Sequence, residues 1–154
     1  PIFRENDLII LMNENIKLLR ELDRSININV LYNAERVILK SDKEQLNRVF
    51  FNLIKNSIES IQQNAENISD FNKNITIELN QVNDHINLTI SDNGIGFESL
   101  KKNIKDILNP YFTTKKNGSG LGLSIVNKIV NDHNGKIRFI PITDGAKIIV
   151  NFIK

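Results

Sequence analysis

Apolar residues recur at helical spacing in two long stretches of the first half of the chain. Over residues 7–22, Asn6 or Asp7 is available as a helix cap, and the residues near helical spacing are Leu8, Leu11, Met12, Leu18, Leu19 and Leu22. Asp42 then opens a strong helix that runs through about Ile61. The apolar face of this second helix consists of Leu46, Val49, Phe50, Leu53, Ile54, Ile58 and Ile61. Both segments are therefore predicted to pack one side against a core.

Alternation of apolar and polar residues predicts strands elsewhere in the chain. The predicted strands are 28–33, 36–41, 75–82, 85–92, 136–142 and 146–153. The last four pair into two antiparallel hairpins, with turns at residues 83–84 and 143–145. A further helix is expected over residues 121–134, ended by Gly135. The pattern therefore mixes helices with mostly antiparallel strands.

Connections and chain length complete the predicted fold. Residues 98–108 are expected to form a short helix, residues 110–117 a loop, and the polar stretch 62–74 a mobile connection. With 154 residues and 40% hydrophobic content, the chain has the size of one domain. We expect an α+β fold, a two-layer sandwich in which helices cover one face of a mixed, mostly antiparallel sheet.

Composition excludes several functional classes. The net charge of +2 and the scattered lysines do not form the basic face that nucleic acid or anionic lipid requires. The absence of cysteine excludes disulfides and thiolate metal sites, and two histidines alone cannot build a zinc site. No apolar run approaches the roughly 20 residues of a membrane span, so we expect no membrane contact. The first residue is proline rather than methionine, which indicates a piece of a longer parent protein.

The block NLIKNSIES places polar side chains beside the apolar face of the second predicted helix. At about 100° per residue, Asn52, Asn56 and Glu59 share one strip, whereas Arg48 and Lys55 lie further toward solvent. An asparagine oxygen is a suitable neutral ligand for Mg²⁺, which takes few protein ligands. The alternative is a pair of ordinary boundary asparagines.

The block DNGIGF follows an apolar strand and contains two glycines around Ile95. Gly94 and Gly96 permit a sharp turn and close approach of the backbone to a flat ligand. The Asp92 carboxylate could then accept a hydrogen bond from the exocyclic amine of adenine. A plain Asp-Asn-Gly turn is the alternative, but it would require neither the second glycine nor Phe97.

In NGSGLGLSIV, Gly118, Gly120 and Gly122 alternate as a helix begins. Such a segment can direct several amides at phosphate oxygens, with help from the positive end of the helix dipole. It is neither a P-loop nor a dinucleotide fingerprint, because the residues and spacing differ. Lys115 and Lys116, just upstream, could counter phosphate charge. A flexible loop with solvated lysines is the alternative.

These three blocks, together with NPYFTTKK from Asn109, resemble the catalytic and ATP-binding domain of sensor histidine kinases over residues 42–152. That family lies within the gyrase, Hsp90, kinase and MutL superfamily and has the Bergerat-type ATP-binding fold. The segment PYFTTKKNGSGLGL is similar to nitrogen-regulation kinases of the NtrB/NtrY type. The resemblance implies an N-terminal helix and strands over 1–41 and a nucleotide-binding core over 42–154.

The resemblance also implies a role for each candidate residue. Asn56 would ligate Mg²⁺, Asp92 would read adenine, and Gly94, Ile95 and Gly96 would shape the base pocket. A lid over about 109–121 would cover the ATP phosphates. The implied contacts of ATP in and directly after this segment are Lys115, Gly118, Ser119, Gly120, Leu121 and Gly122.

Two positions depart from patterns seen in the superfamily. ATP-hydrolysing members carry a glutamate as general base four residues before the metal asparagine, where this chain has Asn52. An amide cannot take that proton, so we expect weak hydrolysis and a nucleophile supplied by another protein surface. Glu59 stands where many histidine kinases have a basic residue. Either a lysine near the lid replaces that residue, or nucleotide binding is weakened.

The phosphorylated histidine of the family is missing from this chain. His85 falls in a hairpin turn and His133 near a helix end, so we expect both to be solvated or packing residues. The resemblance implies an acceptor histidine on a dimerising two-helix domain before Pro1. The phosphoryl group would then pass to an aspartate of a response regulator. The parent would be a homodimer with this domain in the cytoplasm, and an inner-membrane anchor is an option for it.

Two other functional classes remain open. An anti-sigma-factor serine kinase shares this fold and would need no preceding histidine domain. A non-catalytic docking module would have a decayed site and bind no nucleotide.

Overall fold

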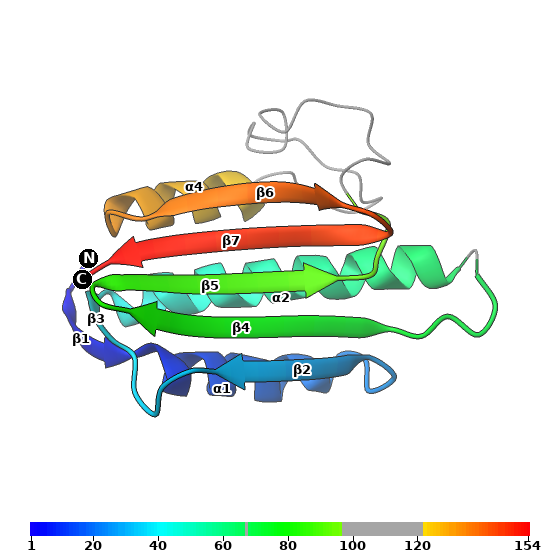
Figure 1. The fold of residues 1–154 in the computed structure, drawn as a ribbon, viewed down its shortest axis with the longest axis horizontal. Coiled ribbons are helices and arrows are strands. Elements are labelled where there is room, and N and C mark those ends of the chain that lie inside the picture. The colour runs from blue at the N-terminus through cyan, green and yellow to red at the C-terminus, as the bar shows by residue number, and fades with distance from the viewer. Residues whose placement is uncertain (67, 97–121) are drawn as a thin grey trace.

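A computed structural model of the chain describes residues 1–66, 68–96 and 122–154. Within these residues, five strands form one mixed sheet in the order β2-β4-β5-β7-β6 (Figure 1). Their bounds are Asn27–Tyr32 (β2), Asn74–Val82 (β4), His85–Asp92 (β5), Lys136–Ile142 (β6) and Gly145–Ile153 (β7). β2 runs parallel to β4, and the other neighbouring pairs are antiparallel. The predicted mixed, mostly antiparallel sheet is confirmed.

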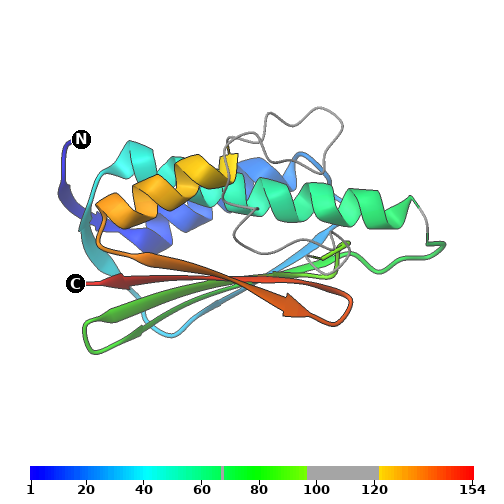
Figure 2. The ribbon, with the colours of Figure 1, turned by 90° about the horizontal axis from the view of Figure 1, so that it is seen from above.

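Helices cover one face of this sheet (Figure 2). In the described part of the chain they are α1 (Leu8–Arg20), α2 (Lys43–Ala65) and α4 (Gly122–Asp132). The Asp7 carboxylate caps α1 by accepting from the Ile9 N–H at 3.0 Å, and Asp42 caps α2 through the Gln45 N–H at 3.0 Å. The two-layer sandwich predicted from the sequence is therefore correct.

A single hydrophobic core fills the space between the helices and the sheet. Every residue of the predicted apolar face of α2 is buried. The sheet contributes the inward half of its alternating positions, such as Ile75 and Ile77 of β4 and Leu88 of β5. Leu8 and Leu19 of α1 join the same cluster. The N-terminal segment is thus packed as part of this core.

The structure differs from the sequence prediction at two segments, residues 4–7 and the C-terminal end of α2. Residues Arg4–Asp7 form strand β1, paired antiparallel with β3 (Ile38–Ser41) in a small separate sheet. β1 was not predicted, because its charged sequence carries no apolar alternation and the strand exists through its pairing. α2 continues to Ala65, so the start of the stretch predicted as a mobile connection is helical. Its glutamines and alanine are favourable helix residues.

Helix α4 ends differently from the prediction. Its last residue is Asp132, and the left-handed residue after it is Asn134, with φ 57°, rather than Gly135. Asparagine tolerates this conformation, and the Gly135 N–H then donates to the Val130 carbonyl at 2.9 Å. The helix predicted over 98–108 lies outside the described residues.

The two histidines differ in burial. His133 is buried, where its Nε2 accepts from the Asp42 N–H at 3.0 Å and its Nδ1 bonds the Ile129 carbonyl at 2.8 Å. Its ring stacks on Phe3 with the centroids 4.7 Å apart. His85 is exposed at the start of β5. The predicted packing and solvated roles fit these positions.

Candidate functional site

The polar strip of α2 lies as the helical spacing predicts. Asn52, Asn56 and Glu59 are half-buried, while Arg48 and Lys55 are exposed. The Lys55 ammonium lies 3.9 Å from the Glu59 carboxylate, one helical turn away. Asn52 and Asn56 therefore line the edge of a helix that is otherwise buried in the core.

Asp92 is a buried carboxylate at the end of β5. Inward positions of this strand alternate through Ile86, Leu88 and Ile90, so Asp92 is the fourth side chain directed to the helix side. One carboxylate oxygen accepts from the Gly94 N–H at 2.9 Å. Burial raises the pKa of the Asp92 carboxyl, and hydrogen bonding by Gly94 and Ser57 opposes the rise.

The turn after Asp92 lies directly against α2. The Ile95 N–H donates to the Ser60 hydroxyl at 3.0 Å. A Cβ on Gly94 would lie 2.2 Å from that hydroxyl and 2.6 Å from the Ser60 carbonyl carbon, so only glycine fits without a shift. Gly96 has a φ of 74°, a conformation that favours glycine. The two predicted glycines therefore do permit close approach, but the close approach observed here is to the protein itself.

Asn93 connects the same turn to its surroundings. Its side-chain oxygen accepts from the Asn74 N–H at 2.9 Å, and its carbonyl accepts from the Asn64 amide at 3.1 Å. These bonds tie the turn to the start of β4 and to the C-terminal part of α2. The backbone around Asp92 is thus fixed on both sides.

The phosphate-binding candidates are only partly described. Gly122 is the first residue of α4, which packs on α2, and a Cβ there would meet nothing within 4 Å. The lid predicted over 109–121 and Phe97 lie outside the described residues. So do the candidate contacts Lys115, Gly118, Ser119, Gly120 and Leu121.

Sequence reasoning missed three residues that shape this site. Ser57 of α2 is buried on the core side of that helix, Ser60 of α2 accepts from the Ile95 N–H of the turn, and Gly145 is the first residue of β7, which pairs with β5. A Cβ on Gly145 would be 2.0 Å from the Asp92 carbonyl oxygen. A signal for Ser57 was present, because it interrupts the apolar stripe four residues after Leu53. No sequence signal pointed to Gly145 beyond its place in a predicted hairpin turn.

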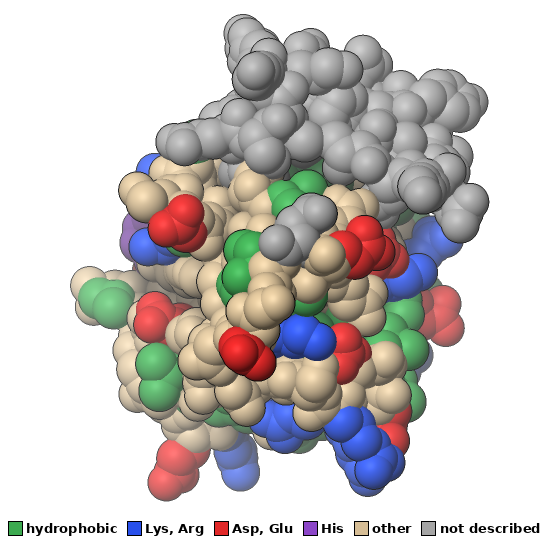
Figure 3. Space-filling model, turned by 90° about the vertical axis from the view of Figure 1, so that its right-hand side faces the viewer, with side chains coloured by type: hydrophobic (Ala, Val, Ile, Leu, Met, Phe, Trp, Pro, Cys, Tyr) green, Lys and Arg blue, Asp and Glu red, His purple; other side chains and the backbone are tan. Residues whose placement is uncertain are grey.

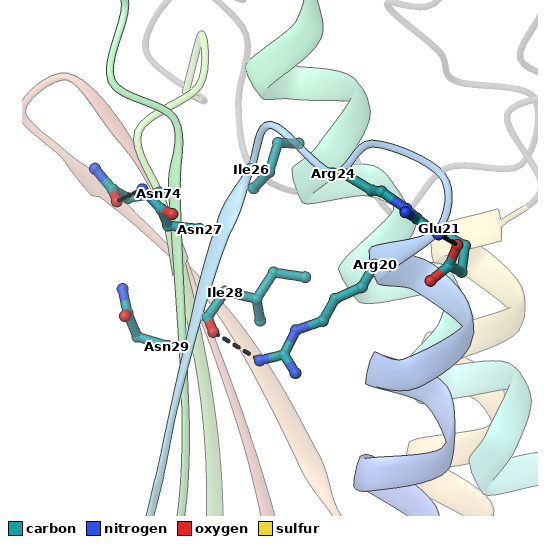
Figure 4. A pocket seen from close by; sticks show the side chains of 8 residues that line it. All are labelled: Arg20, Glu21, Arg24, Ile26, Asn27, Ile28, Asn29 and Asn74. Carbon is teal, nitrogen blue, oxygen red and sulfur yellow. Dashed lines mark hydrogen bonds and ion pairs between the residues drawn. The ribbon is translucent and has the colours of Figure 1, made fainter.

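A separate pocket lies between the end of α1, the start of β2 and Asn74 of β4 (Figure 4). Arg20 donates to the Ile28 carbonyl there at 3.0 Å, and Arg24 pairs with Glu21. None of the candidate nucleotide residues lines it.

At the end of the molecule that carries the turn, acidic and basic side chains are interspersed (Figure 3). No helix in the described ranges is long and apolar enough to cross a membrane.

Comparisons with known proteins agree with this geometry. A family model described as histidine kinase-, DNA gyrase B- and HSP90-like ATPase matches residues 41–154. An NtrY-like sensor histidine kinase of Rickettsia bellii is 34% identical over 153 residues, which is 97% of this chain and 23% of that protein. The solved catalytic domain of histidine kinase ThkA superposes with a TM-score of 0.83 at 30% identity, covering 99% of this chain and 95% of that one.

A second solved structure shows ThkA in complex with the response regulator protein TrrA. It matches with a TM-score of 0.78 at 28% identity, over 99% of this chain and 42% of the matched one. The chain spans about a quarter of the length of the curated relatives it matches. It belongs to the histidine kinase-, DNA gyrase B- and HSP90-like ATPase family, as an ATP-binding catalytic domain of the sensor histidine kinase type.

Proposed function

We propose that this chain binds ATP with Mg²⁺ and presents the γ-phosphoryl group to a histidine on a separate domain of its parent protein. The observation that carries the proposal is Asp92, a buried carboxylate fixed at the end of β5. A carboxylate held there suits a base with an exocyclic amine and opposes one with an oxygen at that position. Residues 1–41 and 42–154 would act together as one domain.

Two asparagines of α2 and the segment before α4 have the remaining proposed roles. When bound, ATP supplies the phosphoryl group and Mg²⁺ neutralises its charge. Asn56 would hold the metal with a neutral oxygen, because Mg²⁺ takes few protein ligands. Asn52 cannot remove a proton from water, which favours transfer to another protein over hydrolysis. Lys115 and the amides of residues 118–122 would hold the phosphates.

The length of the relatives supports the partners proposed here. A chain that spans a quarter of such proteins leaves room for a dimerisation and histidine phosphotransfer domain in a homodimeric parent. The ThkA–TrrA complex supports a response regulator receiver domain as the next partner. We place the domain in the cytoplasm, with an inner-membrane anchor an option for its parent. An anti-sigma-factor serine kinase and a docking module remain the competing functions.

A transfer assay separates these functions. The chain is mixed with radiolabelled ATP, Mg²⁺ and the histidine-containing domain of its parent, and the label on each protein is followed with time. We expect label on the added domain that is stable to base and lost in acid, as phosphohistidine is. The chain alone should remain nearly unlabelled. The added domain with its histidine replaced by glutamine is the control. Acid-stable label would indicate the serine kinase, and absence of nucleotide binding would indicate the docking module.

Replacing Asn56 by alanine should remove the magnesium dependence of nucleotide binding. Calorimetry with ADP should give an affinity roughly tenfold lower than wild type in the presence of Mg²⁺, because one metal ligand is lost. Without Mg²⁺ the two proteins should bind alike. Asn131→Ala, which removes an exposed amide at the far end of α4, is the matched control. A variant that still binds more tightly with Mg²⁺ would exclude Asn56 as the ligand.

A further inference from the structure

Four polar residues follow one another at intervals of four along α2. They are Asn52, Asn56, Ser60 and Asn64. Four residues are close to one helical turn, so these side chains form a single ridge, with a rise of about 6 Å between successive positions. Asn52 and Asn56 are the candidate reaction residues. Ser60 and Asn64, both half-buried, continue the ridge toward the C-terminal end of the helix.

The second half of this ridge binds the backbone of the turn after β5. The Ser60 hydroxyl accepts from the Ile95 N–H at 3.0 Å. One helical turn further on, the Asn64 amide donates to the Asn93 carbonyl at 3.1 Å. Two side chains spaced four apart on α2 therefore bind two residues spaced two apart in the turn.

Gly94 connects this attachment to the candidate base-reading carboxylate. It lies between the two bonded residues of the turn, and its N–H donates to the Asp92 carboxylate at 2.9 Å. A Cβ at Gly94 would lie 2.2 Å from the Ser60 hydroxyl oxygen, so the turn lies as close to α2 as a glycine allows. The orientation of the Asp92 carboxylate therefore depends on where α2 holds the turn.

We propose that Ser60 and Asn64 are positioning residues for base recognition, which hold the turn so that Asp92 meets the exocyclic amine of adenine. The inference rests on the function proposed above. A nucleotide would contact the protein at its base and at its metal-bound phosphates, and one ridge of α2 serves both contacts. Asn56 would hold the metal, and the next two positions hold the turn. Because both attachments lie on one helix, the distance between the two contacts is fixed by that helix.

Ser60→Ala and Asn64→Ala test this role through selectivity for the base. ADP and IDP share ribose and phosphates, but IDP has an oxygen where adenine has its exocyclic amine. Calorimetry with Mg²⁺ gives both affinities for the wild type, the two single variants and the double variant. IDP affinity should change little, because the groups proposed to hold its phosphates and metal are kept. The preference of the wild type for ADP should therefore shrink in the variants.

The two residues should contribute unequally. Asn64→Ala should bind ADP roughly fivefold more weakly, because the Asn93 carbonyl loses its side-chain donor. Ser60→Ala should have the smaller effect, because the Ile95 N–H keeps a longer bond to the Ser60 carbonyl at 3.4 Å. The double variant should lose roughly tenfold in ADP affinity.

Gln62→Ala is the matched control on the same helix. The exposed Gln62 amide donates to the Asp23 carboxylate at 3.2 Å rather than to the turn. Its removal also costs α2 one side-chain hydrogen bond, but it should leave the ratio of ADP to IDP affinity at the wild-type value. Asn64→Asp keeps the shape of the side chain and cannot donate to the Asn93 carbonyl. It should reproduce the loss of selectivity, and it gives the same comparison where alanine prevents folding.

The outcomes distinguish the positioning role from the function as a whole. If the variants at Ser60 and Asn64 keep the wild-type ratio of ADP to IDP affinity, the positioning role is overturned while nucleotide binding stands. An equal loss of both affinities is such a case, because it indicates general loss of structure. A wild type that binds ADP and IDP equally overturns base reading by Asp92, and the positioning role with it. If the wild type binds neither nucleotide, the proposed function itself fails.

Discussion

Replacing Asp92 by asparagine should weaken ADP binding by roughly 100-fold, or about 2.7 kcal/mol. Asparagine has the same shape as aspartate. Its oxygen can still accept from the Gly94 N–H, which lies 2.9 Å from the Asp92 carboxylate in the wild type. Its amide nitrogen would then occupy the position of the second carboxylate oxygen. Two donors would face each other when adenine enters, so the site loses an acceptor and gains a repulsion. Calorimetry with ADP and Mg²⁺ measures the loss directly.

The same variant should be more stable than the wild type in the absence of nucleotide. Because burial raises the pKa of Asp92, the folded state holds this proton more tightly than the unfolded state, whose pKa is near 3.8. Stability due to Asp92 therefore falls as pH rises from 3.8 through the folded pKa, and the ionised group is a net cost at neutral pH. Asparagine removes that cost. Thermal melts should show a higher melting temperature at neutral pH, with a difference that shrinks on acidification.

Measuring stability together with ADP affinity distinguishes loss of base recognition from misfolding of the variant. A variant that melts higher and binds ADP poorly has lost recognition, not structure. An Asp92→Asn protein with wild-type affinity for ADP would contradict base reading by Asp92 and move the search to other groups. Weak binding of ADP together with lower stability would contradict the conclusion that the ionised, buried Asp92 carboxylate destabilises the folded state.

Sequence patterns predicted the fold because most of it is encoded by local periodicity. The buried face of α2 and the two hairpins follow from spacings of 3.6 and 2 residues, which the core requires. β1 escaped the pattern because its stability comes from pairing with β3, which lies more than 30 residues away. The helix stop was assigned to Gly135 by composition, although Asn134 can adopt the left-handed conformation.

The site was predictable where a residue type carries chemistry and unpredictable where its role depends on tertiary contact. Asp92, Asn52 and Asn56 stood out because a carboxylate or amide occurs beside an apolar pattern. Ser60 is chemically ordinary in sequence, and its role is visible only when the turn after β5 places the Ile95 N–H against its hydroxyl. The roles assigned to Lys115 and to the glycines of the lid remain predictions.

Gly145 of β7 lies outside the sequence blocks that predicted the site, yet it packs against the backbone at the end of β5. It is the first residue of β7 and pairs with Ile142 in the β6–β7 hairpin. A Cβ at this position would lie 2.0 Å from the Asp92 carbonyl oxygen and 3.2 Å from the Asn93 Cα. Both contacts are to backbone, which cannot move aside as a flexible side chain can. Any larger residue must therefore displace the turn that holds Asp92.

We expect Gly145→Ala to lower the free energy of unfolding by about 3 kcal/mol, at the upper end for overpacking, because backbone must shift. For a domain of this size that corresponds to a fall in melting temperature of roughly 6–12 °C. Nucleotide affinity should fall as well, since displacement of Asp92 disturbs its bond from the Gly94 N–H. Thermal denaturation and ADP calorimetry measure the two effects on the same protein.

Gly122→Ala is the matched control for stability alone, because a Cβ there would meet nothing within 4 Å, whereas Gly122 is itself a candidate phosphate contact. It replaces glycine at the start of α4 with a better helix former and should keep or raise the melting temperature. If Gly145→Ala melts with the wild type, the hairpin can move away from the turn without cost, and β7 does not hold Asp92 in place. If it is destabilised yet binds ADP normally, the clash is relieved by movement of β7 alone. Loss of both stability and affinity is the result that makes Gly145 a structural support of the base site.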